Sequence, residues 1–495
     1  MDNRTPIGQV INNEGTTVTL AGWVSARRDH GKLVFLDLRD ETGTVQVVIS
    51  PKSKAAYEAA QDIRDEWVLS VVGTVQKRPE SMVNPDSAMG TVEVPAEEIV
   101  VLNEAQTPPF PLGTDGYGID EEARLRYRYL DLRRERLQRN LRLRSELVRR
   151  VRQHLFDEGF TEIETPLLTK STPEGARDFI VPSRLHPGSF FALPQSPQQY
   201  KQLLMVGGFE KYFQIARALR DEDVRADRGF EHTQIDMEVA FADQEELRAL
   251  NEELMITVFE AMGRTIKEKP FPVFTYREAI EKFGADKFDV RDEQEKAAGV
   301  LAFAWVVDFP FFEKIEESPS SHKATQGTSS PALRSSEGAK KWTFTHNPFS
   351  MPKEEHVEDL LAGNNLEGII AQQYDLVCNG YEVGGGSVRA HKAEVLRATF
   401  RILGYSDDRI QKEFGHMLEA FSFGAPPHGG IAYGVERLTM LLSDETSLRE
   451  VQAFPQTSSG RTSVVDAPAP VSSAQLEELG LRLRAASKTD QKDEQ

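Results

Sequence analysis

Residues 426–437 read Pro426-Pro427-His428-Gly429-Gly430-Ile431-Ala432-Tyr433-Gly434-Val435-Glu436-Arg437 and run into apolar positions at Leu438, Leu441 and Leu442. The leucine spacing predicts that a helix opens here. A glycine lets a backbone approach a ligand, and an arginine in a first turn adds a planar five-donor cation where the helix dipole already favours anions. The stretch therefore indicates a nucleotide-phosphate site, although a helix cap with a surface ion pair gives the same short pattern.

A second polar segment lies far upstream. Arg220-Asp221-Glu222-Asp223 is followed by Arg225 and Arg228, and then by Glu231-His232-Thr233-Gln234-Ile235-Asp236-Met237-Glu238. Polar and apolar residues alternate from Gln234 to Val239, which predicts a strand with one acidic, amide-bearing face. Before Arg220, alternate residues (Gln214, Ala216, Ala218) share one face with it, which favours an antiparallel hairpin whose face binds a ligand. Polar residues on a strand, however, are often only its solvent-exposed face.

Together the two segments resemble motifs 3 and 2 of class II aminoacyl-tRNA synthetases. The likeness extends to the aspartyl-tRNA synthetases of bacterial type and covers nearly the whole chain. Four further blocks carry it: Phe160-Thr161-Glu162-Ile163-Glu164-Thr165-Pro166 at the end of motif 1; Thr172-Pro173-Glu174-Gly175-Ala176-Arg177-Asp178, similar to a loop that closes over aspartate; Gln195 to Leu203; and Asn379 to Arg389.

The resemblance implies an α+β fold, in which an N-terminal OB-fold β-barrel precedes a class II catalytic domain built on an antiparallel β-sheet flanked by helices. Expected boundaries are 1–106 for the anticodon-binding barrel, 107–123 for a linker, 124–470 for the catalytic domain with a disordered loop over 314–341, and 471–495 for a C-terminal tail. Alternating strand patterns at 18–24, 33–39, 45–49 and 67–73 independently suit a small barrel.

Two helices are predicted from local patterns. Leu147, Val148, Val151 and Leu155 form one apolar stripe that closes near Gly159. Ser196-Pro197-Gln198-Gln199 has the residue order of a serine-capped helix start, which would put Gln198 and Lys201 on one face.

Composition sets independent bounds. The 495 residues suffice for two or three domains. A single cysteine, Cys378, excludes a disulfide framework and a cysteine zinc site. The sequence has neither the apolar run of a signal peptide nor a stretch long enough to span a bilayer, so we expect a cytoplasmic protein with no membrane partner.

The net charge of −19 argues at first sight against RNA as a partner. Binding depends on local patches, however, and residues 124–152 are dense in arginine. This run is interpreted either as an RNA contact or as a helix face paired with Asp131, Glu135 and Glu146.

The resemblance assigns the ATP site and its magnesium. Arg220, Glu222 and Arg437 are the expected catalytic residues, with Arg220 at the α-phosphate and the amino-acid carboxylate and Arg437 at the γ-phosphate and adenine. Asp375 and Glu382 match positions that hold Mg²⁺, which prefers carboxylate oxygens. The full set expected to contact ATP is Arg220, Asp221, Glu222, Gly229, His232, Glu382, Gly434, Val435, Glu436 and Arg437.

The expected amino acid is L-aspartate. Arg389 can clasp its side-chain carboxylate, and Lys201 adds a second positive charge. Asparagine would leave those cations unpaired, at a penalty of about 3–5 kcal/mol. The residues expected to bind aspartate are Glu174, Ser196, Gln198, Lys201, Arg220, Asp236, His346 and Arg389.

The resemblance places the tRNA anticodon at Arg28, His30, Phe35 and Gln46, with Phe35 stacked on a base at about 1–3 kcal/mol. Without the family, Phe35 is better interpreted as a core residue. His30 stands where enzymes that also charge the asparagine tRNA tend to have histidine, although a solvent-facing loop histidine is the alternative and Ser81 weakens the interpretation. A homodimer is expected through the motif 1 strand.

Three features limit the resemblance. The large domain that bacterial members usually carry between motifs 2 and 3 is absent, because Phe288-Asp289-Val290-Arg291 is followed closely by Trp305-Val306-Val307-Asp308. Gly229 and His232 replace a glutamine and a phenylalanine that usually contact ATP.

Two alternative functions compete with that of an aspartate synthetase. An RNA-binding paralogue that had lost catalysis would lack Arg220, Arg437 or Glu382, and all three are present. A synthetase for asparagine or lysine is opposed by Lys201, Asp236 and Arg389 together.

Overall fold

The computed structural model describes residues 4–171, 174–315 and 342–483. The chain forms two compact units, Met1–Asp120 and Glu121–Gln495, and the first of them includes most of the predicted linker. Lys314 ends a strand, and residues 316–341 of the predicted loop lie outside the described part, as does 484–495 of the predicted tail. No helix in these described ranges is long and apolar enough to cross a membrane.

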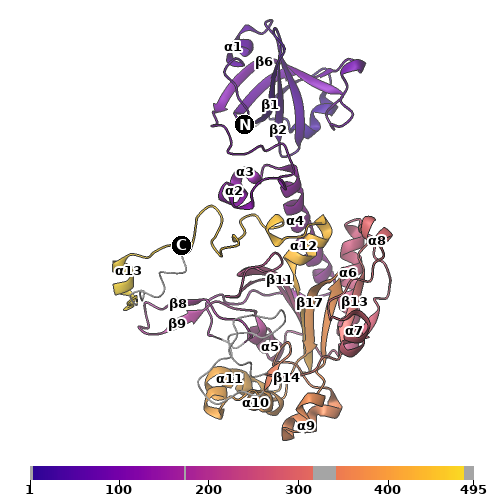
Figure 1. Ribbon diagram of the computed structural model, residues 1–495, viewed down its shortest axis with the longest axis vertical. Helices are drawn as coiled ribbons and strands as arrows, with labels where there is room; N and C mark the ends of the chain where they lie inside the picture. Colours follow the sequence, from indigo (N-terminus) through magenta and orange to yellow (C-terminus); the bar gives the residue numbers. More distant parts are fainter. Residues whose placement is uncertain (1–3, 172–173, 316–341, 484–495) are drawn as a thin grey trace. The chain divides into compact units, whose positions relative to one another are not determined.

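The first unit is a closed barrel of the OB-fold type (Figure 1). Its strands follow the order β3-β2-β1-β4-β6-β5, and a parallel pairing of β3 with β6 closes it. Alternate apolar residues point inward, as Val34, Leu36 and Leu38 do in the second strand. The elements are η1 (Ile7–Asn13), β1 (Thr17–Asp29), β2 (Val34–Asp40), β3 (Gly43–Ile49), α1 (Lys54–Ala59), β4 (Val68–Thr74), β5 (Gln76–Lys77), η2 (Glu80–Met82) and β6 (Val92–Asn103).

The four predicted strands are confirmed to within a few residues, but the interpretation of Phe35 as a core residue is wrong. Val34 and Leu36 fill the interior, so the two-residue period of the strand turns Phe35 to the outer face.

The second unit is built on an eight-stranded sheet in the order β12-β13-β16-β17-β18-β11-β10-β7 (Figure 1). Its central pairings are antiparallel, and the two outermost pairings are parallel. The strands are β7 (Thr161–Glu162), β10 (Lys211–Leu219), β11 (Glu231–Ala240), β12 (Val273–Thr275), β13 (Phe303–Val307), β16 (Gln373–Cys378), β17 (Tyr381–Val388) and β18 (His428–Gly434). Two small hairpins, β8 (Ile180–Pro182) with β9 (Phe190–Ala192) and β14 (Phe312–Lys314) with β15 (Trp342–Phe344), lie outside it.

Helices α4, α6 and α12 pack together beside the central strands. The helices of this unit are α2 (Glu121–Arg126), α3 (Arg128–Asp131), α4 (Glu135–Asp157), α5 (Gln198–Val206), α6 (Gln244–Ala261), α7 (Tyr276–Phe283), α8 (Glu293–Ala297), α9 (Val357–Ala362), α10 (Ala393–Ile402), α11 (Asp407–Ser422), α12 (Val435–Ser443) and α13 (Ser473–Glu478), with short turns η4 (Glu354–His356), η5 (Leu366–Gly368) and η6 (Leu448–Glu450). Between Arg291 and Trp305 the chain forms only α8 and the start of β13, so no extra domain is inserted there.

The apolar stripe predicted for α4 is confirmed. Leu147, Val151 and Leu155 are fully buried, and Val148 packs at the edge of the same core. Gly159 follows the helix with φ of +79°, a left-handed conformation that glycine adopts at little cost. This core lies against Ile235 and Met237 of β11, so one face of the sheet is covered by helices and the opposite face carries the polar residues of β11.

The predicted start of α5 is one residue out. Pro197 is the capping residue and the helix begins at Gln198. Ser196 still contributes, because its hydroxyl accepts the N–H of Gln198 at 3.2 Å while it donates to Glu174 Oε2 at 2.5 Å.

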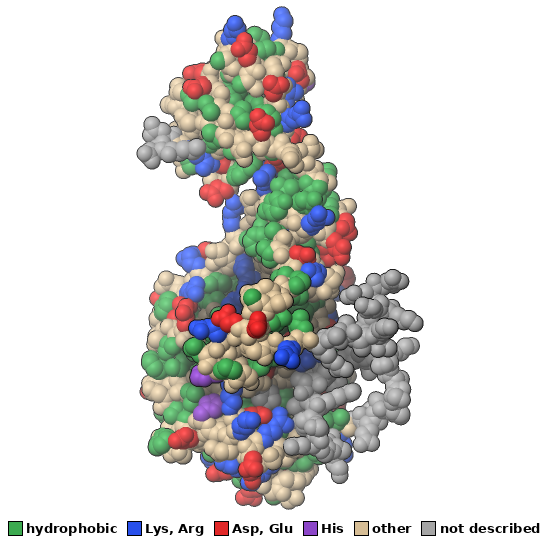
Figure 2. All heavy atoms as spheres, turned by 90° about the vertical axis from the view of Figure 1, so that its left-hand side faces the viewer, with side chains coloured by type: hydrophobic (Ala, Val, Ile, Leu, Met, Phe, Trp, Pro, Cys, Tyr) green, Lys and Arg blue, Asp and Glu red, His purple; other side chains and the backbone are tan. Residues whose placement is uncertain are grey.

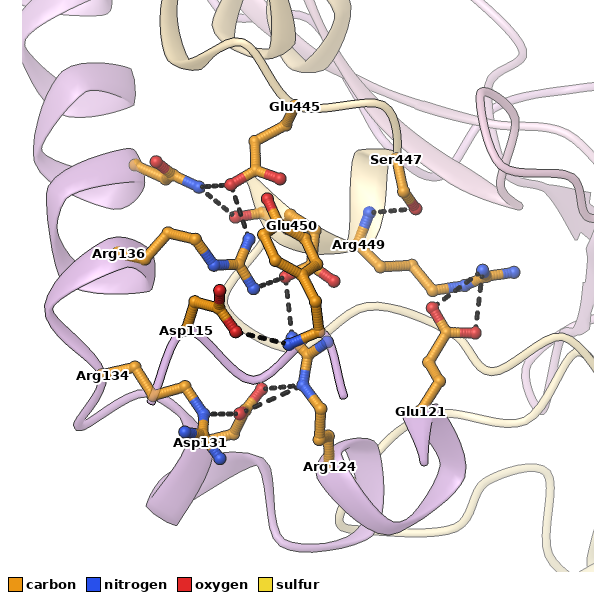
Figure 3. Close-up of polar contacts among 12 residues, drawn as sticks. Asp115, Glu121, Arg124, Asp131, Arg134, Arg136, Glu445, Ser447, Arg449 and Glu450 are labelled. Carbon is orange, nitrogen blue, oxygen red and sulfur yellow. Dashed lines mark hydrogen bonds and ion pairs between the residues drawn. The ribbon is translucent and has the colours of Figure 1, made fainter. Parts of the chain in front are cut away.

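The arginine-rich run is partly internal, because Arg124, Arg128 and Arg134 are buried whereas Arg126, Arg139, Arg142 and Arg149 are exposed. Asp131 is fully buried and accepts hydrogen bonds from Arg124, Arg128 and Arg134, at 2.6 to 3.2 Å. Burial alone would raise the pKa of Asp131, but the hydrogen bonds from Arg124 and Arg134 hold it below the usual range. Figure 3 shows Arg124 and Arg134 converging on Asp131.

The same network reaches the segment after α12 (Figure 3). Arg124 Nη2 donates to Glu450 Oε2 at 2.7 Å, and Arg136 donates to both Glu445, at 2.6 Å, and Glu450, at 2.8 Å. Of the acidic partners expected for the run, Asp131 and Glu146 form ion pairs. On the face drawn in Figure 2 basic and acidic side chains are interspersed. Because Arg126, Arg139, Arg142 and Arg149 are exposed, contact of the run with RNA stays a prediction.

Replacing Asp131 with alanine should destabilise the catalytic unit by about 3–5 kcal/mol, because it leaves Arg124, Arg128 and Arg134 buried without their shared counter-ion. Urea unfolding followed by tryptophan fluorescence measures the change. Glu293→Ala is the matched control, since Glu293 is 89% exposed in a surface pair with Lys296 that is worth about 0–1 kcal/mol. Equal effects of the two substitutions would contradict the buried role of Asp131.

Candidate active site

A row of directly paired residues crosses the polar face of the sheet. Gln214 pairs with Asp236, Asp236 with Ala432, Ala432 with Gly385, and Gly385 with Asp375. Directly paired residues share a face, so Asp236 and Asp375 look out from one surface, three strand spacings or about 14 Å apart. Only a methyl group and a glycine lie between them. This face of the sheet, called the floor below, thus has small residues in its middle and an acidic side chain at each end.

At the first end, two cations and two carboxylates form a buried quartet. Lys201 Nζ lies 2.6 Å from Asp236 Oδ1 and 3.2 Å from Glu238 Oε2. Arg389 donates to both oxygens of Glu238, at 3.0 and 3.3 Å. All four side chains are at most 3% exposed, so the charges balance one another rather than water.

Each cation of the quartet keeps a donor. An ammonium group has three N–H donors and a guanidinium five. Lys201 uses two of its donors in the quartet, and Arg389 uses four, on Glu238, Ser387 and the carbonyl of Gly430. Within the described ranges one N–H of each cation remains, and two such donors match the two oxygens of a carboxylate.

The loop at 174–178 is tied to the entrance of α5. Gln195 exchanges two hydrogen bonds of 3.0 Å with the backbone of Ala176 and donates to Asp178 Oδ1 at 2.6 Å. Arg220 Nε donates to the carbonyl of Gln195 at 3.3 Å. Glu174, Ser196, Gln198 and Arg220 are therefore gathered at one place, near Lys201, as the resemblance implied.

His232 lies on β11, where four arginines contribute positive charge to its surroundings. Burial, and then the positive charges of Arg220, Arg437, Arg217 and Arg228, hold the pKa of His232 well below its ordinary value. A neutral imidazole amid positive charge suits a ligand that brings negative charge, such as a polyphosphate.

Several residues expected at ATP contact other protein groups in this structure. Glu222 pairs with Arg228 at 3.1 Å, and Asp221 with Arg177 at 3.4 Å. A β-carbon on Gly229 would lie 3.1 Å from Gln456 Oε1, so another side chain fills the space beside this glycine. The ATP roles of Asp221, Glu222 and Gly229 stay predictions.

Residues 434–437 form the end of β18 and the start of α12. Gly434 caps the helix with φ of −76°, so no left-handed conformation demands glycine there. Val435 is buried in the core. Glu436 accepts the backbone N–H of Thr233 at 3.0 Å and a hydrogen bond from Arg144 at 2.8 Å, so its carboxylate joins α12 to β11 and α4. An ATP contact by Val435 or Glu436 stays a prediction.

Arg437 points from α12 to the opposite end of the floor. Its Nη1 donates to the carbonyl of Glu382 at 2.7 Å, and its Nη2 lies 3.4 Å from Asp227. The loop between β10 and β11 and the hairpin of β16 and β17 therefore meet at this guanidinium.

Asp375 and Glu382 face one pocket because of a β-bulge. The register shifts between Leu376 and Val377, so Glu382 pairs with Val377 and turns to the side of Asp375. A β-carbon on Gly385 would lie 3.1 Å from Asp375 Oδ1 and 3.5 Å from Glu382 Oε1. The missing side chain leaves a cradle between two carboxylates, which fits a hard divalent cation.

In this structure each of the two carboxylates has a cationic partner. His346 Nε2 lies 3.0 Å from Asp375 Oδ2, and Lys287 Nζ lies 2.7 Å from Glu382 Oε2. Burial alone would lower the pKa of His346, but Asp375 raises it to about 9. Burial alone would raise the pKa of Glu382, but Lys287 and Arg437 lower it to about 2. No group of three or more His, Cys, Asp or Glu ligands occurs in the described ranges.

His346 is thus brought to Asp375 rather than to the quartet. No contact among the described residues joins it to Lys201 or Arg389, so its role in aspartate binding stays a prediction.

The residues expected to bind the anticodon share the outer face of the barrel. Arg28 pairs with Phe35 across β1 and β2, Asp37 pairs with Gln46 across β2 and β3, and His30 meets Phe35 edge to face at 5.5 Å. Arg28 forms a bidentate ion pair with Asp37 at 2.7 and 2.8 Å. Their use in anticodon binding stays a prediction.

Sequence reasoning missed three contributors. No role was predicted for Glu238. It lies two residues after Asp236 in the alternating strand, and this spacing could have placed its side chain on the same face. Lys287 lies in a segment with no motif, and Arg144 lies in the arginine-rich run without an assigned role of its own. Only tertiary contacts bring them to Glu382 and Glu436.

The geometry has close relatives. Models of two families match the chain: tRNA synthetases class II (D, K and N) over residues 120–458, and the OB-fold nucleic acid binding domain over residues 18–102. A protein of Staphylococcus saprophyticus named aspartate-tRNA ligase is 41% identical, with 94% of this chain and 97% of the relative covered. The chain belongs to the aspartate-tRNA ligases. It is also 42% identical to the aspartate-tRNA(Asp/Asn) ligase of a Geobacillus species, over 96% of this chain and 97% of the relative.

The comparison with the Staphylococcus saprophyticus ligase spans 570 positions, more than the 495 residues of this chain. The Staphylococcus ligase therefore has segments that this chain lacks. Among solved structures, the asparaginyl-tRNA synthetase of Pyrococcus horikoshii complexed with asparaginyl-adenylate matches with a TM-score of 0.70 at 21% identity, covering 92% of this chain and 99% of the other. At that identity the likeness bears on the fold.

Proposed function

We propose that this aspartate-tRNA ligase joins L-aspartate to ATP as aspartyl-adenylate, releasing pyrophosphate, and then transfers the aspartyl group to the terminal ribose of tRNA, releasing AMP. The observation that carries the proposal is the buried quartet with its two remaining donors, on Lys201 and Arg389. They suit a ligand with a carboxylate side chain. The buried single cysteine, Cys378, fits work in the reducing cytoplasm.

The activation step needs positioning rather than a covalent enzyme intermediate. The α-carboxylate of aspartate attacks the α-phosphorus of ATP, and the bond to pyrophosphate breaks. Arg220, at the junction of the loop at 174–178 and the hairpin, neutralises charge that grows on the α-phosphate. Arg437, fixed by the carbonyl of Glu382, neutralises the leaving pyrophosphate.

Asp375 and Glu382 would hold Mg²⁺ in the cradle beside Gly385. The ion, when bound, supplies positive charge that screens the phosphates and stabilises the leaving group. Two carboxylates are enough, because Mg²⁺ completes its six ligands with phosphate oxygens and water. Glu382 stays ionised at neutral pH because its pKa is about 2.

Discrimination against asparagine follows from charge. The quartet alone is neutral, and aspartate adds one negative charge that the two remaining donors can receive. Asparagine would present an amide N–H₂ to one of those donors, which leaves an unmatched donor pair in a dry site. A site built for one polar group rejects an analogue that leaves buried groups unpaired.

ATP-pyrophosphate exchange with each amino acid in turn tests the function, and aspartate alone should support it. Arg389→Ala should lower aspartate-dependent exchange by at least about 100-fold, since loss of one member of a buried charge pair costs about 3–5 kcal/mol. ATP affinity, measured by equilibrium dialysis, should change little. Arg401→Ala, in a surface pair with Asp407, is the control. Exchange driven by asparagine, or unchanged aspartate kinetics in Arg389→Ala, would overturn the assignment.

We also propose a homodimer through the motif 1 region. Strand β7 is the edge strand of the sheet beyond β10, and an edge offers unpaired backbone groups. Leu167 and Leu168 follow it and are 51% and 54% exposed, and Phe190 and Phe191 of β9 are also exposed. Such apolar side chains near an edge strand favour burial against a second copy.

Sedimentation velocity should give a dimer for the intact chain. The double substitution Leu167→Asp and Leu168→Asp should give monomers, because charges would be buried at the interface. Phe423→Asp is the control, since Phe423 is 80% exposed on the surface beyond α11. An active monomeric wild-type enzyme would refute the proposal.

Relaxed tRNA choice is the finer part of the proposal. His30 touches Phe35 on the outer face of the barrel, next to Arg28 and Gln46, so it adjoins the predicted anticodon site. The two anticodons differ at one base, and one loop contact of about 1–3 kcal/mol is enough to alter the choice.

Charging assays on purified aspartate and asparagine tRNAs should show that both are aspartylated, and His30→Leu should raise the preference for the aspartate tRNA by about 5- to 100-fold. Pyrophosphate exchange, which needs no tRNA, should stay unchanged and serves as the control. Strict preference for the aspartate tRNA in the wild-type enzyme would contradict the proposed relaxed tRNA choice.

A further inference from the structure

Lys287 lies where it neutralises one wall of the carboxylate cradle. Its Nζ is 2.7 Å from Glu382 Oε2, and the two side chains are 40% and 26% exposed. The proposed functions of Arg437, Asp375 and Glu382 do not use this lysine. It comes from the segment between α7 and α8, remote in sequence from the hairpin that carries the acids.

The backbone of this segment is held in place. Phe288 stacks on Phe283 with ring centroids 4.0 Å apart, and its carbonyl accepts the N–H of Gly380 at 3.0 Å. Gly380 forms the turn of the hairpin, two residues before Glu382. The backbone of Lys287 is therefore held beside the hairpin that carries Glu382, and a flexible four-carbon stem joins it to the ammonium group.

The cradle already contains competing charges. His346 and Lys287 bring positive charge to Asp375 and Glu382, and Arg437 is fixed on the carbonyl of Glu382. Gly385 leaves room for an ion between the carboxylates. A divalent cation in that space would meet the Lys287 ammonium at close range, and like charges repel strongly in a partly buried site.

We propose that Lys287 is a positioning residue that occupies Glu382 until a divalent cation arrives, and that the cation displaces its ammonium group. The inference rests on the metal site proposed above. Before ATP binds, the ion pair with Lys287 holds the Glu382 carboxylate in the cradle and makes the site a poor trap for free metal. After displacement, the ammonium is released beside the place where the phosphates lie, where it can neutralise an oxygen of pyrophosphate.

The test is Mn²⁺ binding to the nucleotide-free enzyme, followed by electron paramagnetic resonance of the unbound ion. Lys287→Met removes the charge and keeps the length of the side chain, so it should tighten Mn²⁺ binding about tenfold, because a competing unit charge is gone. Lys287→Arg should bind Mn²⁺ as weakly as wild type. Lys296→Met, in a surface pair with Glu293, should leave binding unchanged.

Glu382→Gln separates this inference from the metal site itself. If Glu382→Gln loses Mn²⁺ binding while Lys287→Met binds as wild type or more weakly, the metal site stands and the role of Lys287 is overturned. If Glu382→Gln binds Mn²⁺ unchanged, both fail. Tighter binding in Lys287→Met with loss in Glu382→Gln supports both, and thermal denaturation of each variant checks that it is folded.

Discussion

The structure of the catalytic unit depends on charge balance inside β11. Asp236 and Glu238 leave water only because Lys201 comes from α5 and Arg389 from the end of β17 to meet them. Buried charges are tolerated when they are paired and hydrogen-bonded, and they are strongly destabilising when one partner is missing. The helix and the two strands must therefore dock together, and the sheet receives a polar face whose positions are fixed before any substrate arrives.

The backbone around this quartet is built for close approach. A β-carbon on Gly430 would lie 2.2 Å from Glu238 Oε2, so β18 must carry glycine where it passes the carboxylate. The cradle at Gly385 follows the same rule on the next strand, with room kept for a ligand rather than for a protein group. In one sheet, therefore, Gly430 allows close packing against a buried charge, and Gly385 leaves space between two carboxylates.

Much of this was predictable from the sequence, and the remainder has physical reasons. Strand alternation fixed the polar face of β11 and the inward residues of the barrel, and the family motifs located Lys201, Arg389, Asp375 and Arg437. Phe35 was misread as core without the family because an aromatic residue in a strand gives no sign of which face it takes until its neighbours are counted.

Other features depend on tertiary contacts. The pairing of Lys287 with Glu382 joins residues 95 positions apart through a bulge that no pattern announces. The start of α5 differs by one residue from the prediction, and Ser196, expected as its cap, also donates to Glu174, a partner outside the local sequence. The sequence left RNA contact and a paired helix face both open for the arginine run, because two of its acidic partners, Glu445 and Glu450, lie more than 300 residues away.

That separation has a consequence for the order in which a ribosome delivers the chain. The barrel closes with residues from its own first 120 positions, so it can fold while the rest is still being made. Helices α2 to α4 emerge next, but Arg124 and Arg136 wait for Glu445 and Glu450. Until those acids leave the exit tunnel, the nascent catalytic unit presents a cluster of arginines without its full set of counter-ions. Helices α2 to α4 can therefore complete their ion pairs only after residues 445 to 450 have been synthesised.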